Sequence, residues 1–112
     1  MRLNDIPLTE HFNLKEFECP CCHRVRICPL LLLRLEKVRA LWGEPMVLTS
    51  AFRCDAHNSA VGGVKNSLHR LGQAADVRVT QEKQGFFVSL AKKCGFGEIL
   101  PRAERGFVHI AV

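Results

Sequence analysis

Two histidines and one aspartate of this chain form a set that could bind a catalytic metal ion. His69 and Asp76 lie in one short segment, and His109 lies near the end of the chain. Two imidazoles and one carboxylate, with no fourth protein ligand nearby in sequence, suit an open zinc site in which water takes the remaining tetrahedral position. Zinc lowers the pKa of such a water towards about 7, which makes a hydroxide nucleophile available at neutral pH. These three residues therefore predict a hydrolytic zinc centre.

The spacing of the three residues indicates the elements that hold them. His69 and Asp76 are too far apart for one helical face, on which residues three or four apart are neighbours. Gly72 interrupts the segment, and residues 74–79 then have the pattern of a strand. We expect His69 on a loop or tight turn, Asp76 on this strand and His109 on a second, C-terminal strand. By type alone, the same residues also fit an exposed histidine, a capping aspartate and a core histidine.

The remaining sequence predicts elements that could position such a site. Pro29 suits the first turn of a helix, whose apolar face repeats at Leu31 and Leu35 and which Gly43 ends. The other expected elements are a short helix at 14–17, a strand at 46–50, a helical turn at 55–61, a flexible loop at 62–63, a helix capped by Thr80 that runs to about Lys93, and a hairpin around 101–106. This order predicts an α+β domain with an antiparallel sheet and flanking helices.

Length and composition predict one globular domain over residues 1–112, with residues 1–28 as a cysteine-containing N-terminal arm. The chain has 112 residues, of which 47% are hydrophobic and 24% are charged. The leucine run at 30–33 is far shorter than the roughly 20 apolar residues of a membrane span. The first residues lack the apolar segment of a secretory signal, so we expect cytoplasmic synthesis and no membrane partner.

The charge balance bears on the partners of the protein. A net charge of +5 favours weak attraction to polyanions, which fits either an approach to an anionic cell wall or simple solubility. The basic residues are scattered, aromatic residues make up 7% of the chain, and tyrosine is absent. Because no stacking platform is visible, we do not expect nucleic acid as a partner. We expect a monomer.

Six cysteines raise the question of a second metal. They are Cys19, Cys21, Cys22, Cys28, Cys54 and Cys94. Cys19 and Cys22 form a C-x-x-C knuckle that Cys28 or Cys54 could complete as a tetrahedral zinc site. Free thiols are the favoured interpretation, because Cys21 and Cys22 are adjacent and only one of them fits a simple knuckle. Disulfides would require an oxidising compartment.

The residues around the ligand candidates carry a family resemblance. The central pattern is Ser67-x-His69-x-x-Gly72-x-Ala74-x-Asp76. Before it stand Ser-Ala-Phe-Arg-Cys at 50–54 and Val-Gly-Gly at 61–63, and a terminal Val-His-Ile follows it. Together these segments resemble the zinc D-Ala-D-Ala carboxypeptidases and their relatives, subfamily A of peptidase family M15. The resemblance runs from about residue 11 to residue 112. This family includes D,D-carboxypeptidases, vancomycin-resistance dipeptidases and phage L-alanyl-D-glutamate endolysins, and it shares its fold with the Hedgehog signalling domain. The resemblance implies Zn²⁺ bound by the two histidines and the aspartate, and a peptidoglycan peptide as substrate.

The resemblance also implies roles for two residues outside the ligand set. It implies that Arg53 binds a carboxylate or carbonyl of the substrate, a task that suits a planar guanidinium. A structural salt bridge is the alternative for this arginine. Ser67 is expected to support substrate or a ligand through its hydroxyl group, and Asn58 is expected to have a capping or surface role.

Peptide hydrolysis at zinc also needs a general base near the attacking water. Two carboxylates are candidates. Glu104 is slightly favoured, because related enzymes carry an acidic residue close to this position. Glu98 has a geometric argument: if Leu100 pairs with Phe107, Glu98 lies opposite His109, within about 5.5 Å between Cβ atoms. Either residue could instead be a plain surface charge.

Two departures from the family pattern bear on activity. Ala111 stands where relatives often carry Asp or Ser, which removes a partner for a metal ligand. Phe52 replaces the usual tyrosine and lacks its hydroxyl group.

The sequence predicts a zinc metallopeptidase, a carboxypeptidase or endopeptidase, that hydrolyses peptidoglycan stem peptides. We expect it to derive from a phage and to act at the cell wall after lysis or delivery. The alternative is a non-catalytic, metal-stabilised phage structural or wall-binding module. A third interpretation is a zinc-knuckle protein that binds nucleic acid or protein.

Overall fold

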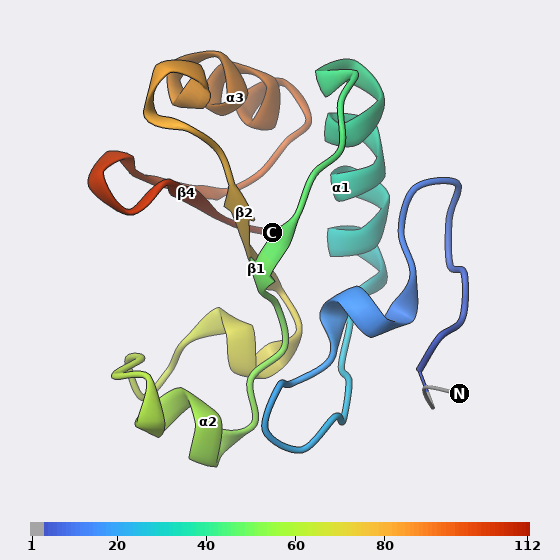
Figure 1. Ribbon diagram of the computed structural model, residues 1–112, viewed down its shortest axis with the longest axis vertical. Coiled ribbons are helices and arrows are strands. Elements are labelled where there is room, and N and C mark those ends of the chain that lie inside the picture. Colours follow the sequence, from blue (N-terminus) through green and yellow to red (C-terminus); the bar gives the residue numbers. More distant parts are fainter. Residues whose placement is uncertain (1–3) are drawn as a thin grey trace.

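An open antiparallel sheet of four strands lies at the centre of the computed structural model, which describes residues 4–112 (Figure 1). The strands are β1 (Leu48–Ser50), β2 (Ala74–Arg78), β3 (Glu98–Arg102) and β4 (Phe107–Ala111), in the spatial order β1-β2-β4-β3. Three α-helices accompany the sheet: α1 (Pro29–Trp42), α2 (Asp55–Ala60) and α3 (Gln81–Lys93). This architecture confirms the predicted α+β class.

The two faces of the central strands have different roles. Successive side chains of a strand point to opposite faces of its sheet. Val77, Val108 and Ile110 are fully buried and belong to the hydrophobic core. Asp76 and His109, which alternate with them, are direct cross-strand partners on β2 and β4. One face of the sheet therefore packs on the core, and the other carries the candidate ligands.

Helices α1 and α3 supply most of the core that supports this sheet. Leu31, Leu35 and Val38 of α1 are fully buried, as are Phe87 and Ala91 of α3. Burial of a leucine or phenylalanine side chain contributes about 1.5–3 kcal/mol to folding. The apolar face predicted for residues 29–43 is thus a core face with a purely structural role.

The ends of the helices agree with the sequence signals. α1 starts at Pro29, and Gly43 ends it with φ 75° while donating its backbone N–H to the Arg39 carbonyl. Only glycine adopts this left-handed conformation without strain. α3 follows Thr80 as predicted, but the Thr80 side chain makes no capping hydrogen bond. The position of that helix start was therefore right, and the capping interaction proposed for it was wrong.

The hairpin formed by β3 and β4 departs from the predicted register. Leu100 pairs with His109, and Arg102 pairs with Phe107. The premise that Leu100 pairs with Phe107 is therefore wrong, and Glu98 lies opposite Ala111. The cause is the length of β3, which continues through Pro101 and Arg102 before a single 3-10 turn at Ala103–Arg105.

The N-terminal arm packs beside α1 and the start of the sheet. Its short helix η1 (Leu14–Phe17) forms where the sequence predicts it, and Asn13 and Glu16 close a capping box at its N-terminus. Phe17 is 1% exposed and joins the core. The arm is therefore anchored by an apolar side chain, although it contains little regular structure.

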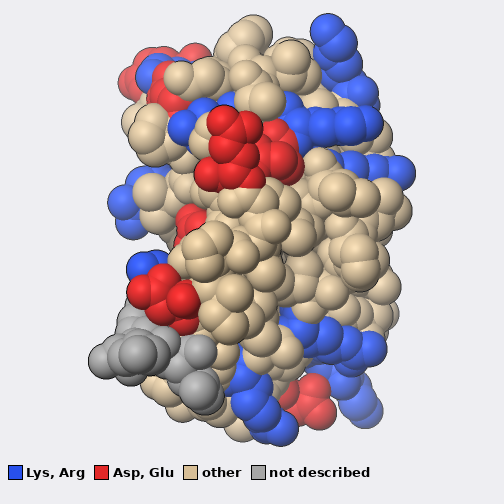
Figure 2. Space-filling model, turned by 90° about the vertical axis from the view of Figure 1, so that its right-hand side faces the viewer, with Lys and Arg blue, Asp and Glu red and all other residues tan. Residues whose placement is uncertain are grey.

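The face that carries the arm and α1 has a mixed distribution of charge. Figure 2 shows basic side chains in separate groups, acidic side chains among them, and a broad uncharged area between. In the part of the chain that the structure describes, the basic groups on this face do not merge into one continuous patch. Within residues 4–112, none of the helices has the length and apolar character that crossing a membrane requires.

Candidate active site

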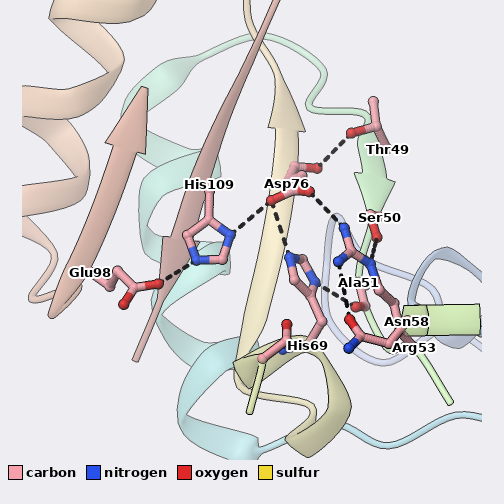
Figure 3. Close-up of polar contacts among 10 residues, drawn as sticks. Thr49, Ser50, Ala51, Arg53, Asn58, His69, Asp76, Glu98 and His109 are labelled. Carbon is pink, nitrogen blue, oxygen red and sulfur yellow. Dashed lines mark hydrogen bonds and ion pairs between the residues drawn. The ribbon is translucent and has the colours of Figure 1, made fainter. Parts of the chain in front are cut away.

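His69, Asp76 and His109 converge on one point of the sheet, as Figure 3 shows. The Oδ1 atom of Asp76 lies 3.2 Å from His69 Nε2 and 3.0 Å from His109 Nδ1. All three candidate ligand atoms lie within 4.8 Å of one another. A tetrahedral zinc with bonds of 2.0–2.2 Å would hold its ligand atoms about 3.4 Å apart. The donor types and their spacing therefore fit a divalent metal ion.

A tight turn places the first histidine of this cluster. His69 lies in the 3-10 helix η2 (Leu68–Leu71), which Ser67 caps by accepting the His69 backbone N–H at 3.2 Å. Gly72 ends η2 with φ 69°, and a Cβ atom there would lie 2.3 Å from the Arg26 carbonyl oxygen. A glycine is thus needed both for the backbone conformation and for the close approach of the arm. The chain then enters β2, where Asp76 lies.

Hydrogen bonds fix the ring of each histidine and leave one nitrogen directed at Asp76. The Ala51 carbonyl oxygen lies 2.7 Å from His69 Nδ1, so this nitrogen is the donor and Nε2 is left as an acceptor. An acceptor nitrogen 3.2 Å from a carboxylate oxygen is unfavourable unless a cation lies between them. Metal-binding histidines usually donate their second N–H to a carbonyl or carboxylate in this way.

Glu98 plays the corresponding part for His109. Its Oε1 atom lies 2.6 Å from His109 Nε2, which leaves Nδ1 directed at Asp76. Glu98 stands directly opposite Ala111 in the sheet. The partner that the sequence lacks at position 111 is therefore supplied across the strand pair by Glu98.

The charge state of Asp76 suits a metal ligand. Burial by itself would raise the pKa of this carboxyl group, but the neighbouring His109 and His69 imidazoles outweigh burial and hold the pKa well below its usual range. Burial would lower the pKa of His109, and its bonds to Asp76 and Glu98 outweigh that effect and raise it. The second oxygen of Asp76 faces Arg53 Nη2 at 3.4 Å. Asp76 is therefore an ionised carboxylate with Oδ1 directed at the two histidines.

Arg53 is held at the edge of the cluster by three contacts. Its Nε atom donates to Ser50 Oγ at 2.9 Å, and Nη1 lies 3.4 Å from Asn58 Oδ1. The third contact is the ion pair with Asp76. Both roles considered for Arg53 are thus compatible with its position, since it forms a structural ion pair and also lines the open cavity.

Asn58 has a supporting role that the sequence did not indicate. It is 3% exposed, and its Nδ2 atom donates to the Val64 carbonyl at 2.8 Å. A Cβ atom on Gly63 would lie 2.1 Å from Asn58 Oδ1. The expected surface role was therefore wrong: Asn58 is buried beneath the 61–66 loop and helps to hold Arg53.

A cavity of about 560 Å³ opens over the three candidate ligands. The site residues that line it are Arg53, Ser67, His69, Asp76, Glu98 and His109. Arg102 and Arg105 also line it, and sequence reasoning did not single them out. Glu104 is exposed in the turn after β3 and is not among the lining residues. Of the two carboxylates considered as a base, the structure brings only Glu98 to the cavity.

Almost the whole chain matches a known protein family. A family model described as Peptidase M15 matches residues 10–111. This range contains the three candidate ligands, Arg53 and Glu98. No curated protein matches the chain.

Proposed function

Because this chain belongs to the peptidase M15 family, we propose that it is a zinc metallopeptidase that hydrolyses peptidoglycan stem peptides. The observation that carries the proposal is the convergence of two histidines and one aspartate below an open cavity. This donor set suits zinc and leaves a coordination position open. Membership of subfamily A within this family and the carboxypeptidase or endopeptidase type are finer parts of the same proposal.

The chain supplies the framework for this reaction through residues on rigid elements. His69 Nε2, Asp76 Oδ1 and His109 Nδ1 would hold the zinc. When bound, zinc would supply a Lewis acid and an activated water molecule for attack on the peptide carbonyl. Ala51 and Glu98 hold the two imidazole rings in orientation by their hydrogen bonds.

The charge of the cavity supports an anionic substrate. Arg53, Arg102 and Arg105 line it, while Asp76 and Glu98 are the acidic residues among the described residues that line it. Stem peptides carry free carboxylates, and a planar guanidinium binds a carboxylate through two hydrogen bonds. Arg53 is already fixed by Ser50 and Asn58, so little conformational entropy is lost when it binds substrate. We assign Arg53 the anchoring of a substrate carboxylate or carbonyl.

Glu98 is the better candidate for the general base. Its Oε1 atom accepts a hydrogen bond from His109, whereas its Oε2 atom has no partner within residues 4–112. The side chain is 46% exposed at the cavity, which gives it access to substrate and water. We therefore propose Glu98, in place of Glu104, as the proton acceptor, in addition to its positioning of His109.

A digest of purified peptidoglycan tests the proposed function. The chain is stripped of metal with a chelator, reloaded with zinc, and incubated with the polymer, and the released peptides are identified by mass. Zinc-dependent release of stem-peptide fragments is expected, and their masses identify the bond that is cleaved. Zinc binding without any release would instead support a non-catalytic wall or phage module. Delivery to the wall by phage lysis belongs to the same proposal.

A further inference from the structure

Four cysteine sulfurs gather at a second place, away from the cavity. They belong to Cys19, Cys21, Cys22 and Cys54, and their sulfur atoms all lie within 4.8 Å of one another. The Cys19 sulfur is 3.7 Å from that of Cys21 and 3.6 Å from that of Cys54, and the Cys21 and Cys54 sulfurs are 3.3 Å apart. We call these four residues the thiol cluster. It joins the N-terminal arm to the loop between β1 and α2.

The sulfur–sulfur distances among Cys19, Cys21 and Cys54 are close to the edge lengths of a zinc tetrahedron, and the Cys22 sulfur lies within 4.8 Å of the other three. A zinc ion with Zn–S bonds of about 2.3 Å holds its sulfur ligands about 3.8 Å apart. A disulfide would bring two sulfurs to about 2.05 Å, and none of the six cysteines forms one. From this arrangement we infer that Cys19, Cys21, Cys22 and Cys54 bind a structural zinc ion, separate from the proposed catalytic one.

The backbone explains how two adjacent cysteines take part in one site. Cys19 donates its N–H to the Arg24 carbonyl and accepts the His23 N–H, both at 2.8 Å. His23 has φ 61°, a left-handed conformation that tightens the turn. Because this turn folds back on itself, Cys21 and Cys22 both reach the same point. The objection drawn from their adjacency therefore does not apply.

A backbone N–H and nearby arginines around the thiol cluster would stabilise negatively charged thiolate ligands. The Cys54 sulfur accepts the His57 backbone N–H at 3.4 Å, an outer contact of the kind that orients metal ligands. Arg24 and Arg26 line a shallow hollow beside Cys54, in which Arg70 is paired with Asp55. The positive charge of Arg24 and Arg26 offsets part of the net negative charge of a zinc ion bound by four thiolates.

The proposed zinc would have a definite structural effect. Residues 18–28 contain no helix or strand, so few backbone interactions order them. Structural zinc contributes its binding free energy directly to folding. The cluster connects Cys19, which is fully buried, to Cys54, which follows Arg53 directly. The ion would therefore fasten the arm to the segment that positions a wall of the active-site cavity.

The metal content of the reduced 112-residue chain tests this inference independently of peptidase activity. The protein loaded with zinc should hold two zinc ions per chain. Cys21→Ser should hold one, and Cys21 is suited to this change because it is exposed and its replacement leaves the core intact. Cys94→Ser is the matched control, because Cys94 lies at the end of α3 outside the cluster, and it should keep two. One zinc in the parent chain, unchanged in Cys21→Ser, would overturn the inference.

Two further measurements on the unaltered chain keep the test decisive if Cys21→Ser does not fold. Cobalt should give the intense visible and thiolate-to-cobalt charge-transfer absorption of a tetrahedral thiolate site, and zinc should abolish it. A mercurial reagent that blocks thiols should release one zinc ion from the cluster. Absence of the cobalt absorption contradicts the inference. So does a thiol count, made on denatured protein without reductant, that shows these cysteines paired as disulfides.

Discussion

The two clusters of potential metal ligands in this chain differ in donors and in surroundings. The first consists of two imidazoles and a carboxylate, and a cavity of about 560 Å³ opens over it. The second consists of four thiols and joins the arm to a loop 35 residues further along the chain. Three donors leave a coordination position for water or substrate, whereas four thiolates fill a tetrahedral zinc. We therefore assign a catalytic role to the first cluster and a role in stabilising the fold to the second.

One short segment connects the two clusters. The Ala51 carbonyl orients His69, Arg53 contacts Asp76, and Cys54 belongs to the thiol cluster. A metal ion in the thiol cluster would thus restrict the motion of the segment that orients His69 and contacts Asp76 in the first cluster. Loss of the first site should nevertheless abolish hydrolysis, whereas loss of the second should lower stability. The substitutions below test the assigned roles.

Among changes outside the ligand sets, Glu98→Gln should have the largest effect on turnover. Loss of a general base lowers kcat by about 10²–10⁴-fold. The amide oxygen of glutamine can still accept the His109 N–H, so metal content should not change. Glu104→Gln is the matched control and should keep parental activity, because Glu104 does not line the cavity.

Glu98→Ala separates the two roles assigned to this carboxylate. Without an acceptor for His109, metal affinity should fall by about 10–100-fold, as measured by competition with a chelator. If Glu98→Gln is fully active while Glu98→Ala binds metal weakly, Glu98 only positions His109 and its assignment as base is wrong.

Arg53→Ala should have an intermediate effect, mainly on KM. Hydrogen bonds to charged groups contribute about 1.5–3 kcal/mol, which corresponds to a loss of about 10- to 150-fold in kcat/KM. The control is Arg70→Ala, because Arg70 pairs with the exposed Asp55 at 2.7 Å and does not line this cavity. Steady-state kinetics on a defined stem peptide, with metal content measured in parallel, gives the comparison. Loss of metal with an unchanged KM would show that Arg53 supports Asp76 and does not anchor substrate.

Glu36→Gln should have the smallest effect, on the stability of the arm. The Glu36 carboxylate accepts the His11 N–H at 2.9 Å and contacts the His11 ring nitrogen at 2.6 Å. Burial would raise the pKa of Glu36, but its interactions with Thr9 and His11 outweigh burial and lower the pKa. A lowered pKa in the folded state stabilises the protein above the unfolded pKa of about 4.3, and this stabilisation is lost as pH falls through the folded value.

The expected cost of Glu36→Gln is about 1 kcal/mol at pH 7, since the pair is partly exposed. Urea unfolding of both proteins across the acid range measures it. The difference should decrease as pH falls below the unfolded pKa of about 4.3. A difference that is constant from neutral to acid pH would show that the Glu36 charge does not stabilise the fold.

Much of the site's scaffold could be predicted because it depends on local patterns. Gly72 and the strand pattern at 74–79 indicated a turn before Asp76, and the structure has η2 and β2 there. The C-terminal strand expected to carry His109 is likewise present as β4. The register of β3 against β4 could not be predicted, because it depends on a 3-10 turn whose length the sequence does not signal.

The contacts that complete the two clusters arise from tertiary packing. The acceptor for His69 is a backbone carbonyl, which has no side-chain signature. Asn58 is buried because the loop at Gly63 closes over it, and a polar residue in a short helix gives no sign of this. The thiol cluster required the position of Cys54 relative to the arm, a contact between segments 35 residues apart.

The substitution Asp76→Asn tests the central claim most directly. Asparagine keeps the shape of the side chain but removes the negative charge that faces both histidines. The measurement is the zinc content of the folded variant, taken together with its release of peptides from peptidoglycan. The account predicts the loss of one zinc ion and of all hydrolysis, with the zinc of the thiol cluster retained. A variant that keeps its full zinc content and still releases peptides would contradict the account, because His69, Asp76 and His109 would then not form the catalytic centre.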